Sequence, residues 1–298
     1  MYCKKIFSFF LKFIGAAVVF SGLHFFCGQK TKGFRPYLIL SDLPNDPRWE
    51  TPPLSPQEQQ DLAKILDQPF TYLGSGGWCY AFLGQDQKTV LKFYRHSHLL
   101  PSSILKDFSF EKLLLKSQTL SPNAQYFQEF TFKSCMLLLK EAKERSGLIY
   151  VHLNKTQNMH KPVVLVDNIG AQHLIDLDKT EFVVQKKADL LIPHLKTLIE
   201  QHRLEEAKRC LDDMLDCLTA LYRSGMRDYD TSLRQNFGFV DGRAITLDLS
   251  SFGFDPSLQD PANYKKEINI KTKRLGHWLK KYHPDLFAYY DAKLKQAS

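Results

Sequence analysis

The chain has 298 residues, of which 44% are hydrophobic, 13% aromatic and 24% charged, a composition that excludes an intrinsically disordered protein. Its length allows a hydrophobic core without disulfides or a structural metal. The net charge of +8 favours anionic partners, but the basic pairs are scattered and no nucleic-acid-binding motif accompanies them, so we expect no specific nucleic-acid partner.

The N-terminus is the most apolar part of the chain. Residues 6–27 are almost wholly apolar, interrupted by Lys12 and His24, and Lys4 and Lys5 precede them. A stretch of about 22 apolar residues can span a bilayer if Lys12 reaches the surface. We therefore expect residues 1–32 to form an apolar helix that anchors the chain in a membrane in a single pass. The alternative is a signal peptide, after which the rest would be secreted.

A proline-rich linker is predicted at 33–56, and regular elements follow it. Ser55, Pro56 and Glu58 have the pattern of a helix start with a capping box. Hydrophobic patterning then predicts strands at 70–73, 80–83, 89–94, 148–153, 163–166 and 182–185, and helices at 123–145 and 190–223. Asp241-Gly242 predicts a type I′ turn in a hairpin of 236–240 and 244–247, before about 45 mostly helical residues.

The six cysteines contain no C-x-x-C pair and no histidines at zinc spacing, so we expect all of them to be reduced thiols. They are Cys3, Cys27, Cys79, Cys135, Cys210 and Cys217. His152, His160, His173 and His194 likewise show no metal spacing along the chain, and we expect them to be surface or core residues. The serines lack the histidine and carboxylate partners of a hydrolase triad.

A glycine-rich turn between the first two strands is the first motif with chemical content. It contains Gly74, Ser75, Gly76 and Gly77, and the next strand carries Lys92. Backbone N–H groups of glycines can approach phosphates without obstruction by side chains. A lysine on the neighbouring strand can add a positive charge to the same site.

A second group of residues follows the long helical stretch. It consists of Asp228 and Asp230, then Asn236, then Asp248 after the predicted hairpin. Phosphoryl transfer requires a carboxylate that orients the acceptor hydroxyl, and amide and carboxylate oxygens that hold Mg²⁺ against the phosphates. An acidic residue between Leu247 and Leu249 also indicates a function, because such a carboxylate usually has a partner.

The order and spacing of these residues resemble the protein-kinase-like superfamily over 70–252. The resemblance implies a two-lobed α+β fold, with an antiparallel sheet and a helix at 57–188 and a mainly helical lobe at 189–298. It implies ATP and Mg²⁺ as cofactors and transfer of a phosphate to a hydroxyl group. The acceptor, whether protein, lipid or small molecule, is left open.

The resemblance also assigns roles to single residues. Counted from Gly225, the acceptor-orienting base is Asp230, with Asp228 as the second choice. Lys92 would contact the phosphates, and Asn236 and Asp248 would bind Mg²⁺. The carboxylate partner of Lys92 would be Glu129, with Glu111 or Glu141 as alternatives. Gln185 and Lys187 lie in the segment that would contact the adenine.

Several departures from the family pattern leave other interpretations open. Cys79 replaces the third glycine of the loop, Ser250 replaces the glycine of the metal-binding segment, and no histidine precedes Arg227. A catalytically weak or inactive pseudokinase that serves as a membrane-anchored scaffold is the main alternative. A chance match of the motifs in an unrelated membrane-anchored protein is the third.

Overall fold

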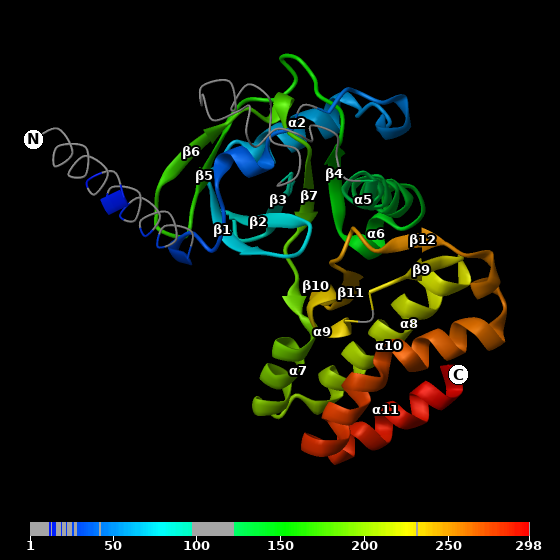
Figure 1. Cartoon of the computed structure of the whole chain (residues 1–298). Helices are drawn as coiled ribbons and strands as arrows, with labels where there is room; N and C mark the ends of the chain where they lie inside the picture. The colour runs from blue at the N-terminus through cyan, green and yellow to red at the C-terminus, as the bar shows by residue number, and fades with distance from the viewer. Residues whose placement is uncertain are drawn as a thin grey trace, which may run out of the picture.

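The computed structural model describes residues 29–41, 43–96, 122–230 and 232–297, with a few single positions between 12 and 26; at 122–128 and 297 the backbone alone is described. Glu111 and most of the predicted apolar segment at 1–32 lie outside the described residues. The chain folds as an α+β protein, in which a mixed sheet precedes a mainly helical part (Figure 1).

The large sheet has seven strands in the order β4-β7-β3-β2-β1-β5-β6. Their bounds are β1 Phe70–Ser75, β2 Cys79–Gly84, β3 Thr89–Tyr94, β4 Leu148–His152, β5 Val163–Val166, β6 Gln172–Ile175 and β7 Phe182–Lys186. The prediction of an antiparallel sheet is wrong at one place, because β5 pairs with β1 in parallel. β5 and β6 form a hairpin that extends the sheet beyond β1, and all other neighbours are antiparallel.

The inner strands β3 and β7 form the centre of the sheet, and almost all of their side chains are buried. Rings from neighbouring strands pack edge to face, such as Phe82 against Phe93. The predicted linker also takes part in this core: Phe34, 1% exposed, contacts the rings of Tyr80 and Phe82. Short 3₁₀ helices, η1 Pro36–Ile39 and η2 Pro47–Trp49, interrupt this segment, so the linker is folded onto the sheet.

The helices of the first part begin and end largely where the sequence predicts. α2 Pro56–Leu66 has the expected capping box between Ser55 and Glu58. The helix predicted at 123–145 is present as α5 Pro122–Glu141 and α6 Lys143–Ser146, with a break at Ala142. Gly147 ends α6 with a φ of 61°, in the left-handed region that favours glycine.

The second part is built mainly of helices. They are α7 Leu191–Glu200, α8 Leu204–Arg223, α9 Leu233–Asn236, α10 Pro261–Tyr282 and α11 Pro284–Ala297, with 3₁₀ helix η4 Pro256–Gln259. The single helical stretch predicted at 190–223 is wrong, because the chain breaks between α7 and α8, where His202 has a φ of 57°. The apolar stripe of α8, from Leu211 to Tyr222, is buried as predicted.

Two small sheets lie at the start of the helical part. β8 Asp189–Leu190, β10 Phe237–Val240 and β11 Arg243–Thr246 form one, and β9 Met226–Asp228 pairs with β12 Phe252–Phe254 in the other. The β10–β11 hairpin is confirmed, and positive φ angles at Asp241 and Gly242 match its predicted type I′ turn.

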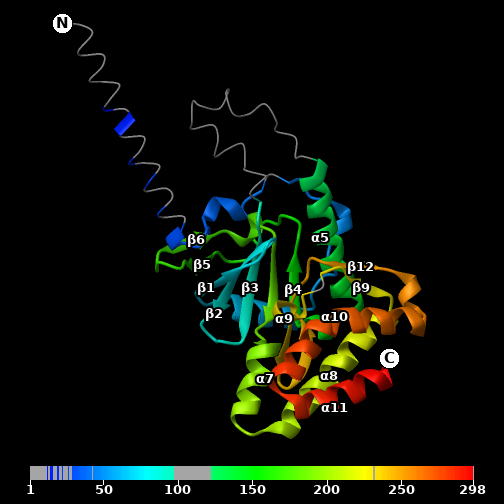
Figure 2. The same cartoon turned by 60° about the horizontal axis from the view of Figure 1, so that its bottom comes forward.

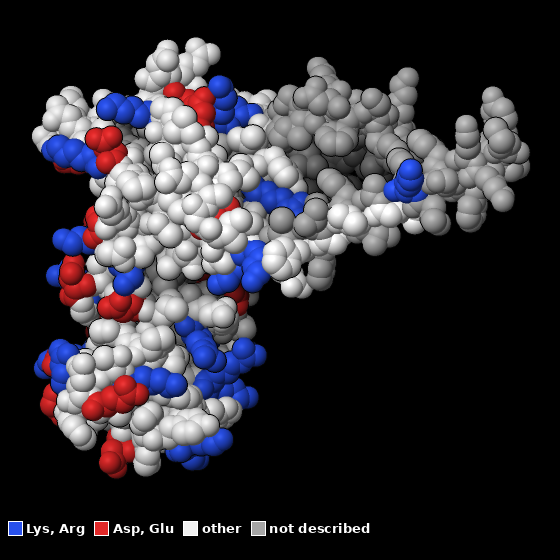
Figure 3. Space-filling model, turned by 90° about the vertical axis from the view of Figure 1, so that its left-hand side faces the viewer, with Lys and Arg blue, Asp and Glu red and all other residues white. Residues whose placement is uncertain are grey.

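Figures 1 and 2 show the sheet above the helical part, with α5 beside β4. β7 leads down from the sheet through β8 to α7. The small sheets formed by β8–β12 lie where the two parts meet (Figure 1). Basic and acidic side chains both occur over the sheet and the helical part on the face drawn in Figure 3. Among the described residues, no helix combines the length and apolar character needed to cross a bilayer.

Candidate functional site

The β9–β12 pairing brings two distant loops together. Gly225, with a φ of 80°, ends the turn after α8, and its α-carbon lies so close to Phe254 that a Cβ would be 2.8 Å from the ring. Asp228 on β9 lies opposite Phe252 on β12. The residues after Asp228 therefore lie against those that follow Asp248.

Asp228 is a buried structural residue at this junction. It is 6% exposed and forms an ion pair with Lys271 of α10, which is 3% exposed. Ser251 Oγ donates to Asp228 Oδ1 at 2.6 Å, and the Asp230 amide donates to the same oxygen at 3.0 Å. Burial raises the pKa of Asp228, against the opposing effects of Lys271 and Ser251. These contacts leave little room for a role in orienting an acceptor.

Asp230 and Asn236 lie in direct contact. Asn236 Nδ2 donates to Asp230 Oδ2 at 2.7 Å, and the Ser232 amide donates to Asp230 Oδ1 at 2.8 Å. Lys271 Nζ also donates to the carbonyl oxygen of Asp230, which holds the main chain in place. Because the Asn236 nitrogen is used by Asp230, its Oδ1 is the atom left to bind a cation.

Asp248 follows β11 in a similar arrangement. Its Oδ1 accepts hydrogen bonds from the amide of Ser250 at 2.9 Å and from its hydroxyl at 2.6 Å. Asp248 is partly exposed. Within the described residues, Oδ2 has no hydrogen-bond donor, so one carboxylate oxygen is available to a ligand or metal.

Lys92 reaches from β3 to the segment that carries Asp248. Its Nζ donates to the carbonyl oxygen of Leu247 at 2.8 Å. Burial raises the pKa of Cys79, at the start of β2; nearby Lys92 lowers it and nearby Asp248 raises it further. Lys92 therefore lies next to the residue before Asp248, on the strand that pairs with β2.

The glycine-rich turn is compact and open on its outer side. The Gly76 amide donates to the Cys79 carbonyl at 2.9 Å, and Arg95 donates to the Gly76 carbonyl at 3.2 Å. A Cβ at Gly74, Gly76 or Gly77 would meet no atom within 4 Å. Ser75 lies on the same exposed turn. This space is where a phosphate chain could approach the backbone.

Gln185 and Lys187, which were predicted to lie in the segment that contacts the adenine, have side chains that bond to other protein groups. Gln185 is 1% exposed, and its side chain donates to the carbonyl oxygens of Ser146 at 2.6 Å and Thr246 at 3.4 Å. Lys187 pairs with Asp189 at 3.2 Å. The predicted contact of the Gln185 side chain with a nucleotide is not available in this structure, because that side chain is buried and bonded inside the protein.

Glu129 is bonded to two residues other than Lys92. It accepts from Arg48 at 2.9 Å and from Lys133, one turn along α5, at 2.8 Å. Glu141 pairs with Lys140, and Glu111 lies outside the described residues. In the part of α5 whose side chains are described, neither carboxylate is bonded to Lys92.

The sequence interpretation missed Lys271 and Ser251, which hold the two aspartate loops together. Lys271 could have been found, because it lies within the apolar stripe of α10 formed by Ile268, Thr272, Leu275 and Leu279. A lysine at such a position usually pairs with a buried carboxylate. The Leu247 carbonyl has no sequence signal, because any residue could provide it.

Comparison with known proteins adds only distant similarities. No family model matches the chain, and no curated protein matches it. Among solved structures, it is similar to WbdD, a bifunctional kinase-methyltransferase, at 15% identity and a TM-score of 0.35, over 74% of this chain and 44% of WbdD. It is also similar to Rv3197 of Mycobacterium tuberculosis, solved with erythromycin, at 14% identity and a TM-score of 0.29, over 78% and 66% of the two chains.

The chain thus spans less than half the length of WbdD. TM-scores this low do not establish a shared fold or function. What the site can do follows from its own chemistry: Lys92 is bonded to the residue before Asp248, and the Leu247 amide donates to the Asn236 carbonyl at 2.7 Å, which links this segment to the Asp230–Asn236 pair. This combination of an ammonium, carboxylates and an amide suits a polyphosphate with a hard divalent cation.

Proposed function

We propose that the chain is an ATP- and Mg²⁺-dependent phosphotransferase that acts on a hydroxyl group. The observation that carries this proposal is the convergence of Lys92, from the sheet, with Asp248, from the helical part, through the 2.8 Å bond between Lys92 Nζ and the Leu247 carbonyl. Asp230 and Asn236 are held together beside the same junction by a 2.7 Å bond.

The donor atoms fit Mg²⁺. This ion prefers oxygen ligands and usually takes only one or two from the protein, with the rest from phosphates and water. Asn236 Oδ1 and Asp248 Oδ2 are the oxygens left by the internal hydrogen bonds described above. Bound there, the ion would neutralise negative charge on the phosphates.

Asp230 is the residue best placed to orient the acceptor. Its carboxylate is fixed by Ser232 and Asn236 and is only partly exposed. It would accept the hydroxyl proton as the acceptor oxygen bonds to the terminal phosphorus and the bond to the leaving ADP oxygen breaks. The glycine-rich turn would hold the phosphates through its amides, and Lys92 would exchange the Leu247 carbonyl for a phosphate oxygen.

One observation favours the alternative, a catalytically weak or inactive pseudokinase that serves as a membrane-anchored scaffold. In the described part of α5, Glu129 and Glu141 are paired elsewhere, so Lys92 has a carbonyl rather than a carboxylate as its partner. A scaffold would not require the carboxylate. Loss of Asp230 would abolish the turnover of a phosphotransferase, whereas it would leave the scaffold function of a pseudokinase unchanged.

The deciding experiment uses the full chain in detergent, with Mg²⁺-ATP and a mixture of hydroxyl acceptors. The enzyme would show a Mg²⁺-dependent rise in melting temperature with ATP and release of ADP. Asp230→Asn should keep the thermal shift and lose turnover, whereas Asp248→Asn should lose both. No thermal shift in the wild type would contradict the phosphotransferase, and a shift without any turnover would favour the pseudokinase.

We further propose that residues 1–32 tether this domain to a membrane with the nucleotide site on the side where ATP is present. Support comes from the apolar sequence of 6–27 alone. Sedimentation of sealed vesicles, followed by protease treatment, would test the tether. A chain without the tether would remain in the supernatant. A tethered chain with the nucleotide site on the opposite side would be protected from the protease.

A further inference from the structure

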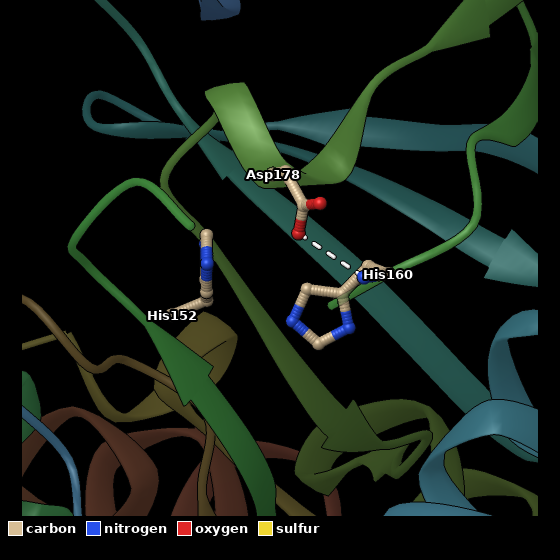
Figure 4. A group of neighbouring side chains, drawn as sticks. All are labelled: His152, His160 and Asp178. Carbon is tan, nitrogen blue, oxygen red and sulfur yellow. Dashed lines mark hydrogen bonds between the residues drawn. The ribbon is translucent and has the colours of Figure 1, made fainter. Parts of the chain in front are cut away.

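Three side chains with metal-binding atoms meet at the far end of β4 from Gln185. His152 is the last residue of β4, His160 lies in the β4–β5 connection, and Asp178 belongs to the 3₁₀ helix η3 Leu177–Lys179. One ligand atom from each lies within 4.8 Å of the others (Figure 4). His152 and Asp178 are buried, and His160 is partly exposed.

The hydrogen bonds of His152 define which of its nitrogens carries the lone pair. Nδ1 lies 2.9 Å from the carbonyl oxygen of Thr180. A carbonyl oxygen can only accept, so Nδ1 carries the proton and Nε2 the lone pair in the neutral ring. A backbone carbonyl on the opposite nitrogen is the usual arrangement of a metal-binding histidine.

The cluster then has too few protons for its acceptors. Thr156 Oγ1 lies 3.2 Å from His152 Nε2 and 2.5 Å from Asp178 Oδ1. The hydroxyl has a single proton, and its shorter contact is with Asp178, which also accepts from the His160 amide at 3.1 Å. With the proton directed to Asp178, the Nε2 lone pair of His152 has no donor, and a cation would satisfy it.

We propose that His152, His160 and Asp178 bind a divalent transition-metal ion of the Zn²⁺ type. Two imidazoles and one carboxylate suit Zn²⁺ better than Mg²⁺ or Ca²⁺, which prefer all-oxygen sites. Metal bonds of about 2.0–2.2 Å would hold the three ligand atoms close together, as their mutual separations within 4.8 Å allow. The ion would hold the β4–β5 connection against η3, and water or a protein hydroxyl would complete its coordination.

This inference does not depend on the phosphotransferase. His152 pairs with Phe182 at the start of β7, whereas Leu148 pairs with Gln185 at the other end of the same two strands. The metal cluster and the nucleotide site therefore use different residues. Loss of one should leave the other measurable.

The test uses the full chain in detergent, stripped with EDTA and titrated with Zn²⁺ alone, without nucleotide. We expect one equivalent to bind and to raise the melting temperature. Co²⁺ in place of Zn²⁺ should give the visible absorption of a four- or five-coordinate site. Less than one equivalent of Zn²⁺, with no thermal shift and no Co²⁺ spectrum, would overturn the proposal without reference to any variant.

Variants locate the ion. His160→Gln removes a ligand whose side-chain hydrogen bond is made with the Tyr150 hydroxyl at 3.2 Å, and it should weaken Zn²⁺ binding by about 100-fold or more. His277→Gln, at an exposed position of α10, is the matched control and should bind like the wild type. Equal Zn²⁺ affinity in both variants would also overturn the assignment. The melting temperatures of the metal-free variants show that each is folded.

Discussion

Lys92 Nζ donates a 2.8 Å hydrogen bond to the main-chain carbonyl oxygen of Leu247, 155 positions further along the chain. Lys92 lies on β3, and Leu247 precedes Asp248, so the bond joins the sheet to the helical part. It also places an ammonium beside the carboxylate proposed to bind Mg²⁺. Substitutions of Lys92 and Asp248 should therefore affect nucleotide binding, whereas substitutions of the buried residues around them should affect stability.

Lys92→Met should weaken Mg²⁺-ATP binding by roughly 10- to 100-fold, since a hydrogen bond to a charged group contributes about 1.5–3 kcal/mol. Nucleotide-induced thermal shifts over a range of ATP concentrations measure this loss. Lys88→Met is a control, because Lys88 is exposed in the turn before β3. Similar affinities of the two variants would exclude Lys92 from the site.

Asp228 and Asp230 should differ in what their loss affects. Asp230→Asn should reduce phosphate transfer by about 10²- to 10⁴-fold and leave nucleotide affinity unchanged, because an amide cannot accept the proton. Asp228→Asn should lower the free energy of unfolding by about 3–5 kcal/mol, because it leaves Lys271 charged and buried.

Urea unfolding and turnover, measured on both variants, separate these effects. Adding Lys271→Met to Asp228→Asn should restore much of the stability, since it removes the unpaired charge. A stable Asp228→Asn protein without turnover would instead make Asp228 the acceptor-orienting residue.

Gly76→Ala should reduce nucleotide affinity while changing the stability of the nucleotide-free protein by less than about 0.5 kcal/mol. The added Cβ would meet no protein atom within 4 Å, so its only obstruction would be to a bound phosphate. Gly225→Ala is the contrasting variant. It should destabilise the protein by about 1–3 kcal/mol, because φ is +80° and the Cβ would lie 2.8 Å from Phe254. Unchanged ATP affinity in Gly76→Ala would show that the phosphates do not bind at the glycine-rich turn.

Local signals in the sequence predicted much of the fold. The capping box of Ser55 and Glu58, the left-handed Gly147 and the turn at Asp241-Gly242 each depend on residues a few positions apart. The parallel pairing of β5 with β1 could not be predicted in this way, because Phe70 and Leu165 meet only in the folded chain. The break at His202 was also missed, since the apolar pattern continues on both sides of it.

In the candidate site too, contacts between residues close in sequence could be predicted, and contacts between distant residues could not. Asp230 and Asn236 are six positions apart, and their proximity follows from the short loop between them. Asp228 and Lys271 are 43 positions apart, and nothing near Asp228 indicates its partner. Spacing along the chain likewise hides the histidine cluster: His152 and His160 meet Asp178 only after η3 has folded back onto the end of β4.

Acid should weaken the fold through His160. Burial lowers its folded-state pKa from the ordinary 6.5 to about 4, so the unfolded chain binds a proton more readily between these values. Stability therefore falls as the pH is lowered from 6.5 to 4, by roughly 2 kcal/mol once partial solvent exposure is allowed for. Urea unfolding in EDTA at several pH values should show a smaller loss for His160→Gln, and equal losses would mean that His160 is not the titrating group.

Glu129→Gln distinguishes the pairing seen in this structure from the one that the kinase resemblance implies. Glu129 is bonded to Arg48 and Lys133 at a partly exposed position, so its loss should cost less than about 1 kcal/mol of stability. If these pairs persist when ATP binds, nucleotide affinity and turnover should remain at wild-type levels. A loss of turnover comparable to that of Lys92→Met would mean that α5 turns on nucleotide binding and brings Glu129 to Lys92. Arg48→Ala provides the control, because it frees Glu129 from one partner while keeping the carboxylate.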